Sequence, residues 1–326
     1  MVTRPTWTNT GRRWLPEVMD DVIVLGAGVI GLTCAVRLLE AGARVRVLTA
    51  DAPETTVSRL AAAVWYPTRT AADPRVLAWA RAAYDEFMSQ AADGVPGVAR
   101  RPTRMVIRDG EAGTPWWAAA VPDFAAYPGE WRFTVPSVEM QEYTRWLVAL
   151  IQSRGGVVAR GRVASLRELG GRAGTVVNAT GLASRVLAGD STVFPARGQI
   201  VGVANPGLVT SVRDEGHPGG MAYIHPRSRD VVLGGTFQPG DWNETPDPAT
   251  TAAILERCAE LVPELAGAQP LWDAAGLRPT REGGPRLEIA PEPLPSGTRL
   301  VHCYGHGGAG VTLSWGCADE VAGLVA

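Results

Sequence analysis

"DVIVLGAGVIGLTCAVRLLEAGARVRVLTAD", residues 21–51, is the stretch of sequence that decides the fold. A short β-branched run leads into a glycine-rich turn, an apolar helical segment follows, and a second β-branched run begins after Gly42. Gly42 stands just past the last helical turn, where glycine commonly ends a helix. The pattern therefore predicts a strand, a helix and a second strand.

The turn between the first strand and the helix carries the spacing G-x-G-x-x-G at Gly26, Gly28 and Gly31. The first glycine permits the tight turn, the second lets the backbone approach a pyrophosphate, and the third allows close helix–strand packing. Asp51 follows the second strand, where an acid that binds ribose is expected. The motif does not separate NAD from FAD, and a glycine-rich turn without a ligand is the alternative. The residues predicted to form this cradle are Gly26, Ala27, Gly28, Val29, Ile30, Gly31 and Asp51.

The composition is that of an ordinary globular protein. The chain has 326 residues, 46% of them hydrophobic and 20% charged, with a formal net charge of −2. This charge lacks the basic excess of nucleic-acid binders, and no apolar run is long enough to predict a membrane span. The four cysteines contain no C-x-x-C pair, which favours buried thiols in a reducing compartment over a disulfide framework. We expect a cytoplasmic protein that binds neither nucleic acid nor membrane; a homodimer is compatible with the sequence.

Nucleotide-binding patterns recur at the beginning, middle and end of the chain, and strand patterns dominate after residue 196. Between residues 68 and 150 the sequence predicts two helices joined by loops rich in proline and tryptophan. The predicted fold is α/β (mixed α+β), with a Rossmann-like dinucleotide-binding domain interleaved with a mostly antiparallel β-sheet substrate domain. The predicted boundaries are 20–70, 150–200 and 296–326 for the first domain, 71–149 and 201–295 for the second, and 1–19 for a disordered N-terminal extension.

Several later segments closely resemble the D-amino-acid oxidase family of FAD enzymes. The resemblance runs, with gaps, from about residue 20 to the end of the chain. It rests on the N-terminal cradle and on "TTVSRLAAAVWYP" (55–67), "VNATGLAS" (177–184), "ARGQIVGV" (196–203), "YIHPRSRDVVLGGTFQPGDWNE" (223–244), "GLRPTREGGPRLE" (276–288) and "VHCYGHGGAGVTLSWGCADEVAGL" (301–324).

The resemblance implies that FAD is the cofactor and that it is held non-covalently. A glycine-rich turn that leads into a helix can present N–H groups and a positive helix end to the flavin as the ring gains negative charge. By resemblance, the cofactor contacts outside the cradle are Ser58, Ala62, Ala63, Val64, Val163, Gly181, Gly307, Gly308, Ala309, Gly310, Val311 and Thr312.

The resemblance also implies the substrate-binding residues. Arg278 matches the arginine that binds the substrate carboxylate, and the planar guanidinium suits a carboxylate because it can donate two parallel hydrogen bonds. Tyr223 matches its tyrosine partner, and Gly308 matches the glycine whose carbonyl accepts a hydrogen bond from the substrate amine. Without the family, a surface ion pair and a packed aromatic would be the simpler interpretations of Arg278 and Tyr223.

The sequence departs from the family at Gly219, which stands where eukaryotic members carry a tyrosine on a mobile lid. Tyr66 and His225 fall where the family lines its side-chain pocket. Relatives that act on acidic substrates add a second cation near that pocket. We interpret Arg213 and Arg227, the two arginines nearby in sequence, as solvated surface residues, and therefore expect neutral D-amino acids.

The predicted activity is oxidation of a neutral D-amino acid by hydride transfer from Cα to flavin, with release of a 2-oxo acid, ammonia and hydrogen peroxide. Alternatives are a glycine or sarcosine oxidase, a D-amino-acid dehydrogenase that reduces a quinone, a D-aspartate oxidase, an NAD-linked dehydrogenase, or a non-catalytic flavin-binding protein. A metal site at His302, Cys303 and His306 is a further alternative; because these residues flank a strand end and a turn, we predict no metal.

Overall fold

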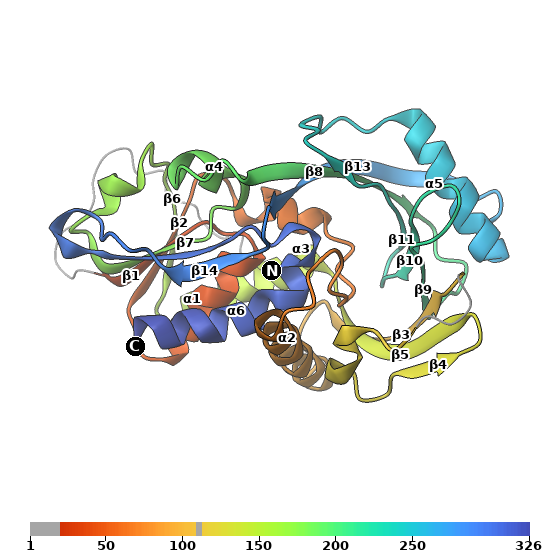
Figure 1. Ribbon diagram of the computed structural model, residues 1–326, viewed down its shortest axis with the longest axis horizontal. Coiled ribbons are helices and arrows are strands. Elements are labelled where there is room, and N and C mark those ends of the chain that lie inside the picture. Colours follow the sequence, from red (N-terminus) through yellow and green to blue (C-terminus); the bar gives the residue numbers. More distant parts are fainter. Residues whose placement is uncertain (1–19, 109–112) are drawn as a thin grey trace, which may run out of the picture.

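The computed structural model describes residues 20–108 and 113–326. The predicted N-terminal extension, residues 1–19, lies outside the described residues. Two sheets organise the fold, and Figure 1 shows them at opposite ends of the molecule. Mixed α/β architecture is thereby confirmed.

The first sheet has the strand order β14-β15-β7-β1-β2-β6 and is parallel except for the β14–β15 pair. We call it the parallel sheet. Its strands are β1 (Asp20–Leu25), β2 (Val45–Thr49), β6 (Val157–Arg160), β7 (Ala173–Asn178), β14 (Arg286–Ile289) and β15 (Arg299–Tyr304).

Side chains alternate across β1, as a strand buried on both faces requires. Val22 and Val24 join the large core beneath the helices, whereas Ile23 and Leu25 join a smaller core on the opposite face. The helices that pack over the large core are α1 (Val29–Glu40), α2 (Pro74–Ala92), α3 (Met140–Ser153) and α6 (Gly310–Val325), and Figure 1 shows α1 and α6 side by side; the short α4 (Ser184–Leu187) precedes β8.

The second sheet is antiparallel except for the β3–β9 pair, and we call it the antiparallel sheet. Helix α5 (Pro248–Leu261) packs on it through Ile254 and Cys258. The strands are β3 (Val98–Val106), β4 (Ala125–Tyr127), β5 (Glu130–Val138), β8 (Val193–Val203), β9 (Ser211–Asp214), β10 (Ala222–Pro226), β11 (Val231–Gly234), β12 (Gln238–Pro239) and β13 (Pro270–Arg281).

Strands β8 and β13 run together from the region of α4 into the antiparallel sheet (Figure 1). Their register pairs Arg278 with Ala196 and Gly276 with Gly198. The ends of both strands near α4 therefore lie close to the parallel sheet, and Arg278, the candidate substrate residue on β13, is held there.

Three strands were not predicted from the sequence. Between residues 68 and 150 the sequence predicts only helices and loops. Strands β3, β4 and β5 lie in that region and join the antiparallel sheet. The sequence of β3, "VARRPTRMV", carries three arginines and a proline, and buries Val98, Thr103 and Met105 but neither Ala99 nor Val106. Such a strand has only a weak apolar alternation.

The predicted domain boundaries do not coincide with the two sheets. Strand β14 belongs to the parallel sheet, although its residues fall in the predicted segment 201–295. Strand β8 begins at Val193, before the predicted boundary at residue 200. The division into domains stays a prediction. The predicted boundaries differ from sheet membership at β14 and at β8.

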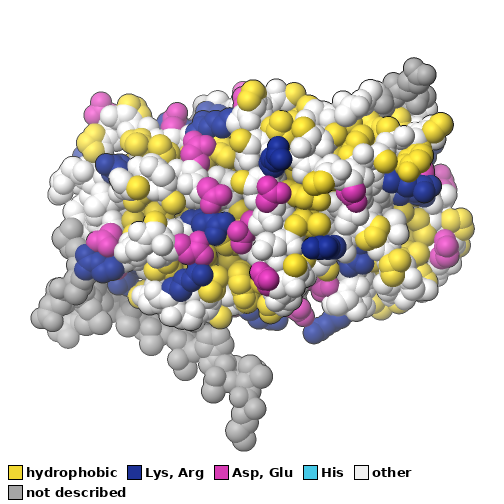
Figure 2. All heavy atoms as spheres, turned by 90° about the horizontal axis from the view of Figure 1, so that it is seen from below, with side chains coloured by type: hydrophobic (Ala, Val, Ile, Leu, Met, Phe, Trp, Pro, Cys, Tyr) yellow, Lys and Arg dark blue, Asp and Glu magenta, His cyan; other side chains and the backbone are white. Residues whose placement is uncertain are grey.

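On the face shown in Figure 2, acidic and basic side chains are interspersed among apolar and uncharged ones. No described helix is both long enough and apolar enough to cross a membrane.

Close packing of α2 against α6 depends on Gly316. A Cβ at this position would lie 2.3 Å from the Cα of Trp79 and 2.4 Å from its carbonyl oxygen, and backbone cannot move aside cheaply. We expect Gly316→Ala to lower the free energy of unfolding by about 2 kcal/mol, measured by urea unfolding followed by circular dichroism.

Gly323 provides the matched control, because it lies on the same helix with no atom within 4 Å of an added Cβ. Gly323→Ala should raise the free energy of unfolding by about 0.5 kcal/mol through helix propensity. Equal unfolding midpoints for the two variants would contradict this account of the α2–α6 contact.

Candidate active site

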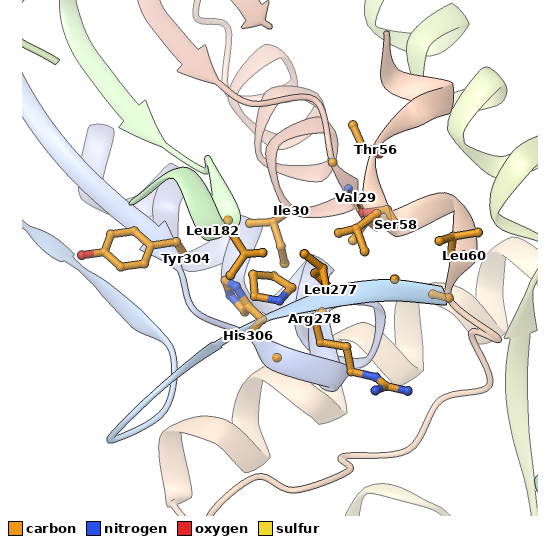
Figure 3. Close-up of a pocket in the computed structure, with 18 of the residues that line it drawn as sticks. Val29, Ile30, Thr56, Ser58, Leu60, Leu182, Leu277, Arg278, Tyr304 and His306 are labelled. Carbon is orange, nitrogen blue, oxygen red and sulfur yellow. Dashed lines mark hydrogen bonds between the residues drawn. The ribbon is translucent and has the colours of Figure 1, made fainter. Parts of the chain in front are cut away.

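A cavity of about 800 Å³ lies where the two sheets meet. Its lining comes from the cradle, from residues 56–69, from the turn before α6, and from strands of the antiparallel sheet. In Figure 3, Val29 and Ser58 lie on one side of β13, and the Arg278 side chain extends from its other side. A cavity of this size can hold a large organic ligand.

The cradle has the backbone geometry that its glycines predict. Gly26 has φ +112°, and an added Cβ would lie 2.4 Å from the carbonyl oxygen of Ala179. A Cβ at Gly31 would lie 2.0 Å from the carbonyl oxygen of Gly26. Both positions therefore require glycine, the first for the turn and the second for the helix contact.

The first helical N–H of α1 faces Ser58. The backbone N–H of Val29 donates to Ser58 Oγ at 3.0 Å, and Gly28 stands at the helix N-cap in an extended conformation. The free N–H groups and the positive end of the helix macrodipole make this a favourable position for phosphate. Ser58 and the cradle thus come together although they are distant in sequence.

Asp51 lies at the edge of the cavity, at the end of β2. Its side chain is 65% exposed, and one carboxylate oxygen is 3.8 Å from Arg162. Val163 lines the same region. The predicted ribose acid and Val163, a predicted cofactor contact, thus line the same cavity.

The glycine-rich turn before α6 closes the opposite side of the cavity. Gly305 and Gly307 have φ of +85° and +54°, and a Cβ at Gly308 would lie 2.8 Å from Thr68 Cγ2. The hydroxyl of Thr312 accepts from the Tyr66 N–H at 3.1 Å and donates to the Tyr66 carbonyl at 3.0 Å. The Thr312 side chain therefore fixes the neighbouring segment beside the cavity.

Two predicted cofactor residues do not line the cavity. Gly31 packs against Gly26, and Ala309 is fully buried. The cavity is lined by the other predicted residues, namely Gly26, Ala27, Gly28, Val29, Ile30, Asp51, Ser58, Ala62, Ala63, Val64, Val163, Gly181, Gly307, Gly308, Gly310, Val311 and Thr312. Their contacts with FAD stay predictions.

The Arg278 side chain crosses β8 directly over Gly198, where only a glycine leaves room for it. A Cβ at Gly198 would lie 2.0 Å from Arg278 Nη1, and this nitrogen donates to the carbonyl of Thr236 at 3.0 Å. Within the described residues, Arg278 makes no ion pair with a carboxylate. Its charge is thus positioned in the cavity and available to an anionic ligand.

Tyr223 lies flat against glycine in the same way. An added Cβ would lie 2.1 Å from the Tyr223 ring at Gly234 and 2.8 Å from it at Gly235. The ring is buried and lines the cavity, as Arg278 does. The structure thus brings the two predicted carboxylate ligands to one cavity, together with Gly308.

Arg213 is not a solvated surface residue, and that prediction was wrong. It is 6% exposed, lines the cavity, and holds its guanidinium carbon 4.1 Å from the centroid of the Tyr66 ring. Strand β9 pairs with β10 so that Arg213 lies opposite Tyr223. A strand of four residues leaves too short a pattern in the sequence to show which side chains face inward.

Tyr66 and His225 line the cavity as predicted. Burial, followed by the positive charge of Arg213, lowers the pKa of His225 well below its ordinary value, so the imidazole is neutral at pH 7. Arg227 lies elsewhere, paired with Asp230 at 2.7 Å. Gly219 occupies an exposed turn and does not line the cavity.

Sequence reasoning also missed Arg69 and Phe237, which line the cavity with the Arg69 guanidinium carbon 4.1 Å from the Phe237 ring centroid. Arg69 lies outside the segments that carry the family resemblance, and Phe237 lies inside one of them but has a side chain whose chemistry predicts no site. Their place in the cavity follows only from the folded geometry.

Three buried donors meet at the cavity wall: Cys303, His306 and Cys317, whose ligand atoms lie within 4.8 Å of one another. Contact with Cys317 and burial raise the pKa of Cys303, and burial raises that of Cys317, which disfavours the thiolates that a metal needs. All four cysteines are free. The absence of a metal stays a prediction.

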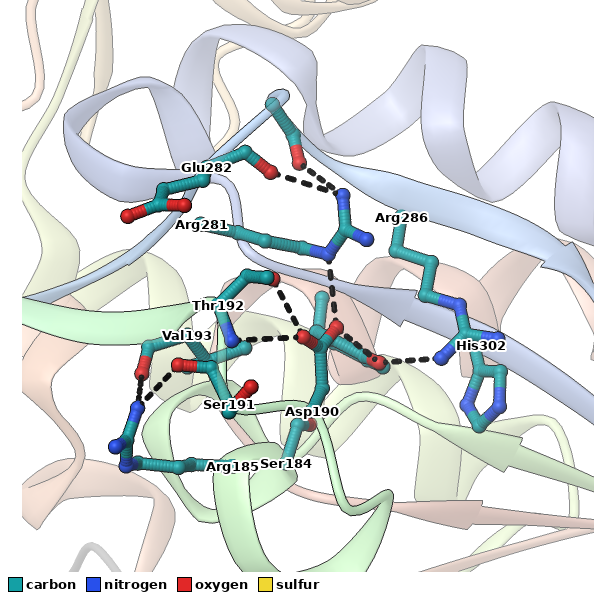
Figure 4. A network of polar contacts seen from close by, with 12 residues as sticks. Ser184, Arg185, Asp190, Ser191, Thr192, Val193, Arg281, Glu282, Arg286 and His302 are labelled. Atoms are coloured by element: carbon teal, nitrogen blue, oxygen red, sulfur yellow. Dashed lines mark hydrogen bonds and ion pairs between the residues drawn. The ribbon is translucent and has the colours of Figure 1, made fainter.

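A polar network fixes the end of β13 beside the glycine-rich turn (Figure 4). The carboxylate of Asp190 accepts hydrogen bonds from Arg281 Nε at 2.8 Å and from the Tyr304 hydroxyl at 2.9 Å, while Thr192 binds its other oxygen. Burial raises the pKa of Asp190, but these hydrogen bonds outweigh it and hold the pKa below its ordinary value. Because Tyr304 lines the cavity, the network also supports the cavity wall.

The fold and the site together define a class of protein: a dinucleotide-binding enzyme whose nucleotide cradle opens into a cationic substrate pocket on a second sheet. The chain belongs to the FAD dependent oxidoreductase family, whose model matches residues 21–324. This confirms the resemblance found in the sequence and makes FAD the cofactor.

The chain is 46% identical over 317 residues to a D-amino-acid oxidase of Rubrobacter xylanophilus, an alignment that covers 94% of this chain and 96% of the relative. It is 35% identical over 335 residues to a human D-aspartate oxidase, covering 93% and 94%. The solved structure of glycine oxidase from Bacillus cereus matches with a TM-score of 0.74 at 22% identity, covering 94% of each chain. The structural match confirms the fold.

The Asp190 network predicts a pH-dependent loss of stability. A carboxyl group whose folded pKa is lowered stabilises the fold above its unfolded pKa of about 3.9, and this contribution is lost as the pH falls towards the folded value. We expect Asp190→Asn to lower the free energy of unfolding by about 2 kcal/mol at pH 7 and by less at pH 3.5, measured by urea unfolding.

Asp85→Asn is the control, because Asp85 is exposed on α2. It should change the unfolding free energy by less than about 0.5 kcal/mol at either pH. A deficit for Asp190→Asn that stays the same at both pH values would contradict the assignment of its carboxylate charge to this network.

Proposed function

We propose that the protein catalyses the FAD-dependent oxidative deamination of D-amino acids. In this reaction O₂ is reduced to hydrogen peroxide, and the amino acid becomes a 2-oxo acid with release of ammonia. The observation that carries the proposal is the position of Arg278, a guanidinium with no carboxylate partner among the described residues, in a cavity continuous with the dinucleotide cradle.

Arg278 binds the substrate carboxylate in this proposal. The Thr236 carbonyl holds Nη1, and the backbone of Gly198 lies directly beneath the guanidinium, so its orientation is set before substrate arrives. A carboxylate can then accept charge-assisted hydrogen bonds from the remaining N–H groups. Tyr223, whose hydroxyl has no protein partner in the described structure, supplies a further donor.

The residues of the cradle and of the turn before α6 fit FAD. A glycine is required where the cradle backbone makes its tight turn, and the α1 N-terminus and Ser58 lie where a pyrophosphate can bind. When bound, FAD supplies the acceptor for two electrons from the substrate. The carbonyl of Gly308 is the proposed acceptor for the substrate amine.

Burial and the protonation state of the thiols support non-covalent cofactor binding. Cys303 and Cys317 are fully buried with raised pKa values, and thiols of this kind are poor nucleophiles.

We further propose that neutral D-amino acids are preferred, although the sequence-based reason for this, a solvated Arg213, was wrong: Arg213 lines the cavity, and its charge is balanced by the Glu215 carboxylate at 3.1 Å. The relative from Rubrobacter xylanophilus, 46% identical to this chain, is a D-amino-acid oxidase. This supports the general activity but does not indicate which substrate side chain is preferred. The cytoplasmic location and the homodimer considered from the sequence stay predictions.

An anaerobic absorbance spectrum tests the proposal. The purified protein is mixed with D-alanine, D-valine or D-aspartate and with each L-enantiomer. Flavin bands that bleach only with D-isomers are the expected result, followed by peroxide formation when air is admitted. Bands that resist all six compounds would refute the proposed activity while leaving family membership intact.

Loss of the Arg278 guanidinium should separate cofactor binding from catalysis. We expect Arg278→Ala to retain FAD and to lower kcat/KM for D-valine at least a hundredfold, because the substrate carboxylate would lie in the cavity unpaired. Steady-state peroxide release and the flavin content of the purified variant are the measurements.

Arg229→Ala is the matched control, since the Arg229 side chain is 84% exposed and outside the cavity. It should leave kcat/KM within about twofold of the starting protein. A similar kcat/KM for Arg278→Ala would remove Arg278 from the site.

A further inference from the structure

We propose that Glu215 determines side-chain specificity by holding Arg213 in an internal ion pair, so that the pocket accepts uncharged D-amino acids and disfavours acidic ones. This inference rests on the proposed function and deepens it. A buried guanidinium beside the substrate site would otherwise favour a second substrate carboxylate.

Arg213 has the position needed to contact a substrate side chain. It lines the cavity, and its guanidinium carbon lies 5.7 Å from the centroid of the Tyr223 ring. Its Nε is buried and has no hydrogen-bond partner among the described residues, and Nη1 lies 3.5 Å from Nε2 of the neutral His225. A buried cation with unused donors needs a counter-ion.

Glu215 supplies that counter-ion. One of its carboxylate oxygens accepts from Arg213 Nη2 at 3.1 Å, and the other accepts from the Tyr66 hydroxyl at 3.3 Å. Burial and the nearby Glu215 carboxylate raise the pKa of Tyr66 above its ordinary value, so the hydroxyl remains a donor. The carboxylate is thus held by two side chains that line the cavity.

The neighbouring carboxylate is engaged elsewhere. Asp214, the next residue to Arg213, pairs with Arg108 at 2.6 Å and is fully buried. Its charge is therefore balanced on the other side of β9. Among the described residues, Glu215 is the carboxylate that pairs with Arg213.

The ion pair has different consequences for acidic and apolar substrates. The side chain of D-aspartate or D-glutamate would bring a second carboxylate to Arg213 and be repelled by Glu215. The side chain of D-valine would leave the pair intact. Glu215 itself lies in the turn after β9 with a side chain 38% exposed, and its partners among the described residues are Arg213 and Tyr66.

The test compares kcat/KM for D-aspartate with kcat/KM for D-valine in the holoenzyme. Glu215→Gln keeps the size of the side chain and one acceptor oxygen but removes its charge. We expect the ratio of D-aspartate to D-valine to rise at least tenfold, mainly through a lower KM for D-aspartate, with D-valine changed less than about threefold.

Glu260→Gln is the matched control. Glu260 is a carboxylate of the same surface region, paired with His217 at 3.0 Å and 59% exposed, and its removal changes the net charge by the same amount. The specificity ratio of this variant should stay within twofold of the starting protein, which separates a local effect from general electrostatic attraction.

A second substitution identifies the cation involved. In the double variant Glu215→Gln/Arg213→Gln, the gained activity on D-aspartate should disappear. If that activity persists, the gain does not come from Arg213 and the proposal is overturned.

Two other outcomes would overturn it: a specificity ratio unchanged by Glu215→Gln, or an unmodified protein that already prefers D-aspartate to D-valine. In both cases the enzyme would still oxidise D-amino acids. Failure of the proposed function is distinct, because then no D-amino acid would bleach the flavin in any variant.

Discussion

The pairing of β8 with β13 is the constraint on which the rest of the structure depends. The two strands stay in register from Trp272 opposite Gly202 to Arg281 opposite Val193, and in doing so they connect the antiparallel sheet with the parallel one. A shift of one residue would turn Arg278 to the opposite face of the sheet. The backbone ladder therefore fixes the position of a charge that no ion pair with a described carboxylate holds.

Glycines on and next to the strands of this sheet make room for large side chains. Arg278 lies over Gly198, Tyr223 lies over Gly234 and Gly235, and Trp272 lies over Gly202. In each case a large side chain fills the volume that a Cβ on the neighbouring strand would occupy. Two of these side chains, Arg278 and Tyr223, line the cavity, and their contact with bare backbone leaves them few alternative rotamers and favours a preformed site.

Much of the fold could be predicted from the sequence. The cradle combines a local strand–helix–strand pattern with two positions, Gly26 and Gly31, where no side chain fits. The substrate residues were placed by resemblance, since an arginine or a tyrosine alone specifies no partner. What could not be predicted depends on contacts between distant segments. Arg213 looked solvated because β9 is short, and β3 was missed because its arginines mask the alternation that a half-buried strand shows.

The state of the cysteines has a consequence for durability. Hydrogen peroxide attacks thiolates, and Cys303 lies in the wall of the very cavity where the proposed reaction would generate it. Cys34, Cys303 and Cys317 are fully buried. Contact with Cys303 and burial raise the pKa of Cys34, contact with Cys317 and burial raise that of Cys303, and burial raises that of Cys317. A buried, protonated thiol reacts with peroxide more slowly than an exposed thiolate, so the burial of these three thiols lowers their susceptibility to the peroxide that the proposed reaction would release.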